Sequence, residues 1–317
     1  MDGQARPAHI DRMGDDHRVF DRALLRRRRA RAAAHSHAGV GYLLTRACAD
    51  LVDRLAVVNR SFPLALEIGA HDGSFRRALA ASASDGKIGT LIATESVEAL
   101  VRRLGPPSLV CDEEALPVKD GALDLAVSLL SLQWTNDLPG ALIQIRRALK
   151  PDGLFLGALI GGESLTELRQ AFYEAEAETL GGVSPRVAPF VEVRTLGGLL
   201  QRAGFALPVV DLDRVRVTYP SPLALLNELR AMGATNVIRE RSRAPLRRET
   251  LLRALDIYQK RFAAPDGRIG ASFDLLHVSG WAPDASQPRP LRPGSAQTRL
   301  ADALGTVEYG AGDAAKP

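Results

Sequence analysis

The stretch Leu64-Ala65-Leu66-Glu67-Ile68-Gly69-Ala70-His71-Asp72-Gly73 decides the fold, because an apolar run ends there in a turn that contains glycine. A short apolar run bounded by turn residues is typical of a buried strand. Similar runs follow at intervals that leave room for a helix between them, at 91–93, 109–111, 125–130 and 154–160. Alternating strands and helices predict an α/β fold built on a doubly wound, mostly parallel sheet.

Apolar residues at three- and four-residue spacing predict the helices that cover this sheet. These helices span 43–55, 138–149, 196–203, 222–233 and 246–263. Two later runs of strand character, 209–219 and 272–281, are expected to complete a seven-stranded sheet, with the last two helices laid over its ligand-binding edge. We expect three parts: an N-terminal arm with helices (1–62), the sheet domain (63–283) and a tail rich in proline and glycine (284–317).

The composition is that of an ordinary globular protein and excludes a disordered or fibrous chain. Of the 317 residues, 46% are hydrophobic and 25% are charged. No run approaches the roughly 18 apolar residues of a membrane span, and the chain does not begin with a hydrophobic signal core. Cys48 and Cys111 lack metal-site or disulfide spacing, so we expect small buried side chains in a reducing compartment.

Charge is nearly balanced, with 41 basic and 37 acidic residues, and therefore does not favour nucleic-acid binding. The exception is a local run of arginines over 26–29 together with Arg31. We interpret this run as the solvated face of a helix. The alternative is a docking patch for an acidic partner.

Polar residues follow the predicted strands, where ligands bind in an open α/β sheet. Glu95 follows the second run, Asp112 and Glu113 follow the third, and Gln133 and Trp134 follow the fourth. With the glycine turn, this order resembles the class I S-adenosylmethionine-dependent methyltransferases. The resemblance implies that the turn approaches the cofactor, that Glu95 holds the ribose hydroxyls and that Asp112 accepts from the adenine amino group. The implied cofactor-binding residues are Glu67, Gly69, Ala70, His71, Gly73, Glu95, Asp112, Glu113 and Leu129.

Two positions depart from the family pattern. Its acid-x-Gly-x-Gly-x-Gly turn has His71 at the middle glycine, and Thr94 stands where the ribose acid is usual, with Glu95 one place later. A histidine side chain at this point would crowd the ligand, and positive φ costs histidine more than glycine.

Longer motifs resemble the methyltransferase-like assembly factors of respiratory complex I over about residues 20–300. They are Phe20-Asp21-Arg22, Asp112 to Pro117, Ser128 to Pro139, Gly161 to Arg169, Met232 to Asn236, and Gly280 to Pro283 followed by Pro293 to Ala296. The resemblance implies a protein partner that is a complex I subunit or assembly intermediate and, for the mitochondrial branch, hydroxylation of an arginine. An arginine-rich chain suits a bacterial, cytoplasmic member, and peripheral association with the inner membrane stays open.

Two other functions stay open. Gln133, where this family often has histidine, resembles the malonyl-carrier-protein O-methyltransferases of biotin synthesis. A non-catalytic assembly chaperone is the third hypothesis, which His71 and Thr94 favour, whereas the retained acids Glu67, Glu95 and Asp112 favour an enzyme.

The candidate catalytic residues are Glu163, Glu167 and Trp134. Glu163 and Glu167 are four residues apart at the expected start of a helix, so they would share a face and could hold a guanidinium. Alternatively, they complement the positive end of that helix. Trp134 would stack on the substrate or anchor the loop.

Four further residues are candidates for contact with the substrate or for a lid over the pocket, namely Phe20, Arg22, Gln133 and Arg169. No metal is expected, because the six histidines form no HxxxH pair or His-x-Asp motif. We expect His35 and His37 to be solvated in an alanine-rich loop.

Overall fold

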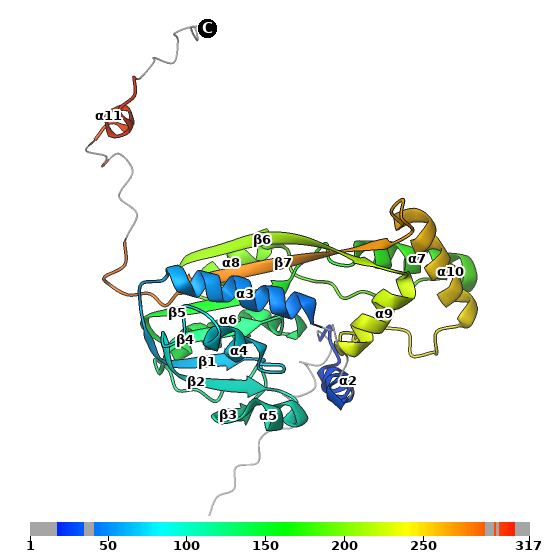
Figure 1. Cartoon of the computed structure of the whole chain (residues 1–317), viewed down its shortest axis with the longest axis horizontal. Helices are drawn as coiled ribbons and strands as arrows, with labels where there is room; N and C mark the ends of the chain where they lie inside the picture. The colour runs from blue at the N-terminus through cyan, green and yellow to red at the C-terminus, as the bar shows by residue number, and fades with distance from the viewer. Residues whose placement is uncertain (1–17, 35–40, 289–294, 296–297, 308–317) are drawn as a thin grey trace, which may run out of the picture. The chain divides into compact units, whose positions relative to one another are not determined.

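The computed structural model describes residues 18–34, 41–288, 295 and 298–307, and it contains a seven-stranded sheet (Figure 1). The strand order is β3-β2-β1-β4-β5-β7-β6. β1 to β5 are parallel, and β7 runs antiparallel to both β5 and β6. The predicted mostly parallel α/β fold is confirmed. The strands are β1 (Phe62–Ile68), β2 (Ile88–Glu95), β3 (Ser108–Val110), β4 (Leu123–Leu129), β5 (Leu149–Ile160), β6 (Ala206–Tyr219) and β7 (Ile269–Trp281).

The strand order reverses between β1 and β4, which run side by side at the centre of the sheet. Ile68 at the end of β1 pairs with Thr94 on one side and with Ser128 on the other. The carboxyl ends of β1 to β4 therefore meet at one edge, and the residues that follow them lie close together. This edge is where an open α/β sheet binds ligands.

Helices cover both faces of the sheet, and every predicted helix is present with shifted ends. The helices before β5 are α2 (Arg22–Ala34), α3 (Tyr42–Val57), α4 (Ser74–Ala80), α5 (Glu98–Leu104), the short η1 (Leu132–Trp134) and α6 (Leu138–Ala148). After β5 come α7 (Thr166–Leu180), α8 (Val193–Arg202), α9 (Pro222–Ala231) and α10 (Arg248–Phe262). Residues 284–317 form a separate unit that contains the short helix α11 (Leu300–Leu304).

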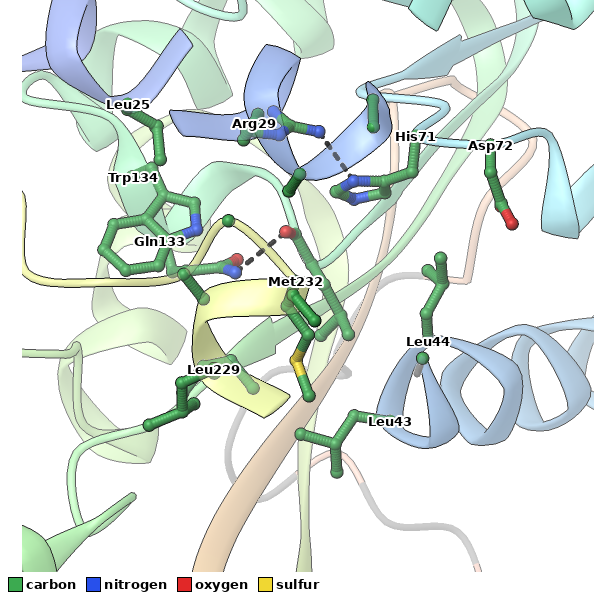
Figure 2. Close-up of a pocket in the computed structure, with 18 of the residues that line it drawn as sticks. Leu25, Arg29, Leu43, Leu44, His71, Asp72, Gln133, Trp134, Leu229 and Met232 are labelled. Carbon is green, nitrogen blue, oxygen red and sulfur yellow. Dashed lines mark hydrogen bonds between the residues drawn. The ribbon is translucent and has the colours of Figure 1, made fainter. Parts of the chain in front are cut away.

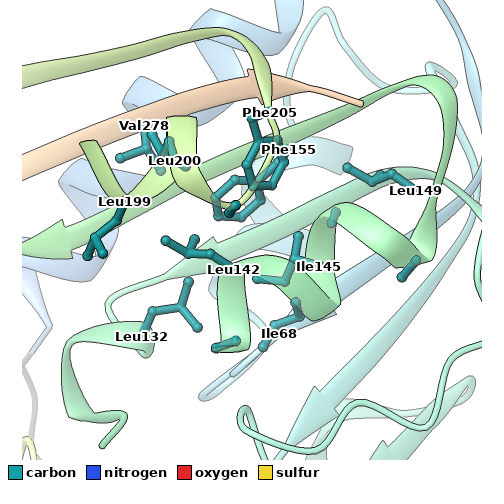
Figure 3. Packing of buried hydrophobic residues seen from close by; sticks show 14 of the residues in the cluster. Ile68, Leu132, Leu142, Ile145, Leu149, Phe155, Leu199, Leu200, Phe205 and Val278 are labelled. Carbon is teal, nitrogen blue, oxygen red and sulfur yellow. The ribbon is translucent and has the colours of Figure 1, made fainter. Parts of the chain in front are cut away.

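Alternate residues of the central strands face two different cores, as the two-residue repeat of a strand requires. Leu66 and Ile68 pack with α6 and α8, as Figure 3 shows for Ile68, Leu142 and Leu200. Ala65 points the other way, toward α3 and α4. Both faces of the central strands are thus buried, which explains why these strands have almost uninterrupted apolar sequences.

The insertion between β6 and β7 builds a third core together with α7. Leu225 of α9 and Tyr258 of α10 are buried against β7, and the Tyr258 hydroxyl donates to the Gly270 carbonyl at 2.9 Å. α9 also lies beside α2 (Figure 1). The insertion consequently reaches the ligand-binding edge of the sheet.

The structure also bears on the two cysteines and on the length of the apolar helices. Cys48 and Cys111 are buried and free, which confirms their predicted role as small core side chains. Within the described part of the chain, no helix is long and apolar enough to cross a membrane.

Candidate functional site

The turn after β1 brings three residues with positive φ together: Gly69 (74°), His71 (52°) and Gly73 (77°). The backbone N–H groups of Gly69 and Ala70 both donate to the Thr94 carbonyl, at 3.0 and 2.8 Å. A Cβ atom on Gly69 would lie 2.2 Å from the Ser131 Oγ. Only glycine therefore fits at position 69, where the turn after β1 touches the segment after β4.

The His71 imidazole lies between the glycine turn and the end of β4. Its Nε2 is 2.7 Å from the Leu129 carbonyl oxygen, and its Nδ1 is 2.6 Å from Nη2 of Arg29. Burial, reinforced by the charge of Arg29, lowers the pKa of His71. A neutral ring protonated on Nε2 satisfies both contacts, since Nε2–H donates and Nδ1 accepts. The side chain thus occupies space that glycine would leave open.

Glu95 is completely buried and faces the glycine turn. Its Oε2 accepts from Nη2 of Arg29 at 2.8 Å and from the His71 N–H at 3.1 Å. Its Oε1 accepts from the Val97 N–H at 3.2 Å. Thr94 points away, because its hydroxyl donates to the Glu67 carbonyl. Glu95, which stands one residue after the position of the family's ribose acid, is therefore the acid that reaches the site.

The three acids after β3 gather around Arg22 at the start of α2. Nη1 of Arg22 lies 2.7 Å from Asp112 and 3.0 Å from Glu114, and Nη2 contacts Glu113. Glu113 also accepts from the Ser131 hydroxyl at 2.8 Å. The acids at the ends of β2 and β3 are thus both engaged by arginines of α2.

The interpretation of the arginine run as a solvated helix face is wrong for Arg29, whereas Arg27 and Arg31 are exposed. The Arg29 side chain is only 7% exposed and is ion-paired with Glu95. Arg26 contacts Asp112 at 3.3 Å, and Arg28 donates to the Asn236 carbonyl. The physical reason is that a buried guanidinium requires carboxylate partners, and this chain supplies them from strands far along the sequence.

Glu67 lies beneath the turn and has no partner for its Oε2 among the described residues. Burial raises the pKa of Glu67 to about 8. The carboxyl group is therefore mainly protonated at neutral pH.

A cavity of about 320 Å³ opens beside His71 and Arg29 (Figure 2). Its polar lining is formed by these two residues together with Asp72, Arg103 and Gln133. The rest is apolar. Most of the residues that form it carry no functional signal in the sequence, because their helical spacing indicates core packing only; Met232 is the exception, since it begins one of the motifs that resemble the assembly factors. The apolar residues include Leu25 of α2, Leu43 and Leu44 of α3, and Leu229 and Met232 at the end of α9.

Gln133 and Trp134 form one wall of this cavity. Nε2 of Gln133 donates to the Leu130 carbonyl at 2.8 Å, whereas its buried Oε1 has no partner among the described residues. Trp134 makes edge contacts with Phe20 and Phe190, at centroid distances of 5.5 and 5.9 Å. Phe20 thereby docks the segment that leads into α2 onto the loop after β4.

Glu163 and Glu167 are not brought together as a pair. α7 begins only at Thr166, so Glu163 lies outside the helix and is exposed. It lines a separate cleft with Arg169 and Glu192. Glu167 is buried and accepts from the Ser272 hydroxyl at 2.6 Å. Neither carboxylate lines the cavity beside His71.

The acceptor groups at this edge of the sheet suit a nucleoside. Glu95 and Asp112 stand at the ends of neighbouring parallel strands, next to a turn that places backbone close to them. Carboxylates accept hydrogen bonds from ribose hydroxyls and from an adenine amino group. In the present arrangement these carboxylates bind Arg29 and Arg22 instead. Among the described residues no group of three or more potential ligands could hold a metal ion, and His35 and His37 lie outside those residues.

Comparison with known proteins finds a family model described as "Methyltransferase domain" over residues 66–157. The mitochondrial arginine hydroxylase NDUFAF5 of Danio rerio is 39% identical over 90% of this chain and 89% of its own length. Its Homo sapiens counterpart is 38% identical over 91% of this chain and 84% of its length. A malonyl-[acyl-carrier protein] O-methyltransferase of Laribacter hongkongensis is 32% identical over 87% of this chain and 91% of its length.

Solved structures support the fold alone. The YcgJ protein from Bacillus subtilis matches with a TM-score of 0.51 at 13% identity, covering 74% of this chain and 98% of that protein. A methyltransferase-like protein of Bacillus halodurans gives the same TM-score and identity, covering 74% of this chain and 99% of its own. The expected class I methyltransferase fold is confirmed.

Proposed function

Because this chain belongs to the methyltransferase-like family that includes the NDUFAF5 arginine hydroxylases, we propose that it is an S-adenosylmethionine-using enzyme that modifies an arginine of a protein partner. The partner is a subunit or assembly intermediate of respiratory complex I, as the sequence resemblance implies. The protein acts in the bacterial cytoplasm, at the membrane surface where that complex is built. The observation that carries the proposal is the pair of acids, Glu95 and Asp112, beside the glycine turn of a methyltransferase domain.

The residues of the cleft have distinct tasks in this proposal. Glu95 holds the ribose hydroxyls, Asp112 the adenine amino group, and the backbone of Gly69 and Ala70 borders the amino-acid portion. The bound cofactor supplies an electrophilic methyl group. Gln133 and Trp134 orient the acceptor, because they line the cavity next to His71 and Gln133 has a free acceptor atom. Positioning of this kind accelerates methyl transfer, and the proton that an arginine acceptor loses when its nitrogen is methylated passes to water.

The alternative substrate is a malonyl carrier protein. Gln133 and the 32% identity to a malonyl-[acyl-carrier protein] O-methyltransferase favour it, and the higher identity to the arginine hydroxylases opposes it. A chaperone without catalysis is the remaining alternative, and the arginines that bind Glu95 and Asp112 favour it.

Three measurements separate these functions. Calorimetry is expected to show micromolar S-adenosylmethionine binding that Asp112→Ala abolishes, whereas Asp120→Ala, which removes an exposed acid paired with Arg147, leaves it unchanged. Absence of heat at millimolar ligand supports the chaperone. A deletion strain that lacks complex I activity but grows without biotin excludes the carrier-protein substrate. Mass spectrometry of complex I subunits from that strain then shows whether the lost modification is a methyl group or an oxygen atom.

A further inference from the structure

α2 closes the cleft with its own cations. Arg29 projects from α2 toward the glycine turn, where Figure 2 shows its contact with His71. The same guanidinium binds Glu95, and Arg22 at the start of the helix binds Asp112. Both arginine side chains are nearly buried, and Glu95 is completely so. The Arg29–Glu95 pair is therefore a buried ion pair, whereas Asp112, the partner of Arg22, is 37% exposed.

Arg29 and a ribose require the same atoms. Oε2 of Glu95 is already shared by Arg29 and the His71 N–H, and Oε1 accepts from the Val97 N–H and from the Ser96 hydroxyl, both at 3.2 Å. A carboxylate that is fully buried and has every partner supplied by protein has no free direction for a diol. The sugar can reach Glu95 only after Arg29 withdraws.

The position of α2 is set by close packing against Gly233. This glycine has a φ of 70°, and a Cβ atom there would lie 2.9 Å from the Arg29 Cα. The Met-Gly-Ala segment at 232–234 thus packs directly against the turn of α2 that carries Arg29. A methyl group on the glycine would push α2 outward without touching any acid of the cleft.

The segment before α2 is held independently of the acids. The Phe20 N–H donates to Asn136 Oδ1 at 2.7 Å, and the Asp21 N–H donates to the Val237 carbonyl at 2.8 Å. Asp21 also accepts from the Leu24 N–H. Residues 20 and 21 can therefore stay in place as a fixed point while the later turns of α2 move.

We propose that Arg29 is an internal lock on the cofactor site: it holds α2 over the cleft, and it must leave Glu95 before a nucleoside can bind there. Binding of the cofactor and release of α2 are then a single coupled event. This inference rests on the proposed function, since it requires that the cleft takes S-adenosylmethionine. It adds that the apparent affinity is lowered by the fraction of molecules in the locked state.

The test measures binding of S-adenosylmethionine by calorimetry to the full chain and to three variants. Arg29→Ala removes the lock, and Gly233→Ala unseats α2 while leaving the acids intact. Arg27→Ala is the matched control, because it makes the same substitution at an exposed position of the same helix. We expect about tenfold tighter binding for the first two variants and no change for the control. Circular dichroism establishes that each variant is folded.

Hydrogen exchange gives a readout that does not depend on affinity. We expect the amides of the later turns of α2 to exchange faster when S-adenosylmethionine is added to the wild-type chain, while the Phe20 and Asp21 amides keep their protection. Equal or weaker binding by both folded variants, or unchanged exchange in α2 at saturating ligand, overturns the lock alone. If neither the wild type nor any variant binds, the proposed function fails and the lock fails with it.

Discussion

The Nε2 atom of His71 lies 2.7 Å from the carbonyl oxygen of Leu129, so the imidazole joins the turn after β1 to the end of β4. This histidine stands where the family pattern has glycine, and its φ of 52° is one that glycine adopts without cost. The ring also contacts Arg29, and thus supports the helix that covers the cleft.

Replacing His71 by glycine is expected to leave S-adenosylmethionine binding unchanged or to tighten it. The substitution removes a side chain from the cleft and takes one partner from Arg29. Calorimetry of the single variant and of the double variant with Arg29→Ala measures the effect. Both substitutions remove the same contact. The change in binding free energy of the double variant should therefore be smaller than the sum of the changes in the two single variants. Weaker binding by His71→Gly would show that the imidazole itself holds the ligand.

Glu67 predicts an unusual dependence of stability on pH. Its pKa in the folded chain is raised to about 8 by burial, from an ordinary value of 4.5. Between these values the unfolded chain has released a proton that the folded chain still holds, so the folded state loses stability as pH rises through this window. The contribution is fully present below about pH 4.5.

Glu67→Gln keeps a neutral side chain and should remove this dependence. From about pH 5 to about pH 8, we expect the free energy of unfolding of the variant to rise relative to that of the wild type by on the order of a few kcal/mol. Urea unfolding of both proteins at the two pH values measures the difference. Parallel stability profiles would mean that Glu67 is ionised in the folded chain.

Glu176 is expected to hold the loop that carries Phe190 to Trp134. Its buried carboxylate accepts from the Ser184 N–H at 2.7 Å and pairs with Arg186. Glu176→Ala leaves the arginine without its partner, so we expect a loss of about 3–5 kcal/mol in the free energy of unfolding. Glu178 lies on the same helix as Glu176, α7, and is an exposed partner of Arg253 on α10. Glu178→Ala should therefore change the free energy of unfolding little. A comparable loss in both variants would show that the buried pair has no special role.

The strands could be predicted from sequence because each buried run is short, apolar and bounded by turn residues, as at 64–68 and 154–160. The acids at the strand ends followed from this, since parallel strands bring their carboxyl ends to one edge. What local patterns could not supply was long-range pairing. Arg29 finds Glu95 across 66 positions, and an arginine-rich helix taken alone indicates solvent on every polar face.

The prediction that two acids pair at the start of α7 is wrong for a local reason. A four-residue spacing places Glu163 and Glu167 on one face only if both belong to the helix, but α7 begins at Thr166 after Leu165 adopts a φ of 56°. Leucine carries no sequence signal for a left-handed conformation. The cavity could not be predicted because Leu43 and Leu229 reach it from distant elements, and their apolar spacing is also that of core residues.

Gly69 and Ser131 give the sharpest stability prediction, because the cost of a Cβ atom can be divided into two parts. Gly69→Ala combines a φ of 74° with a contact of 2.2 Å to the Ser131 Oγ, so we expect a loss of about 2–4 kcal/mol. Gly121→Ala is the matched control, since Gly121 has a φ of 65° and open space around it. It should show the backbone cost alone, about 1–2 kcal/mol.

Ser131→Gly completes the cycle. In that background the clash at position 69 disappears, and Gly69→Ala should cost only as much as the substitution at Gly121 does. Urea unfolding of the four proteins in the cycle and of the Gly121→Ala control gives the coupling energy between positions 69 and 131. A coupling near zero would mean that the turn after β1 can move away from the segment after β4. In that case the glycine would be required by the backbone conformation alone, and the cleft between these two segments would be less rigid than its contacts indicate.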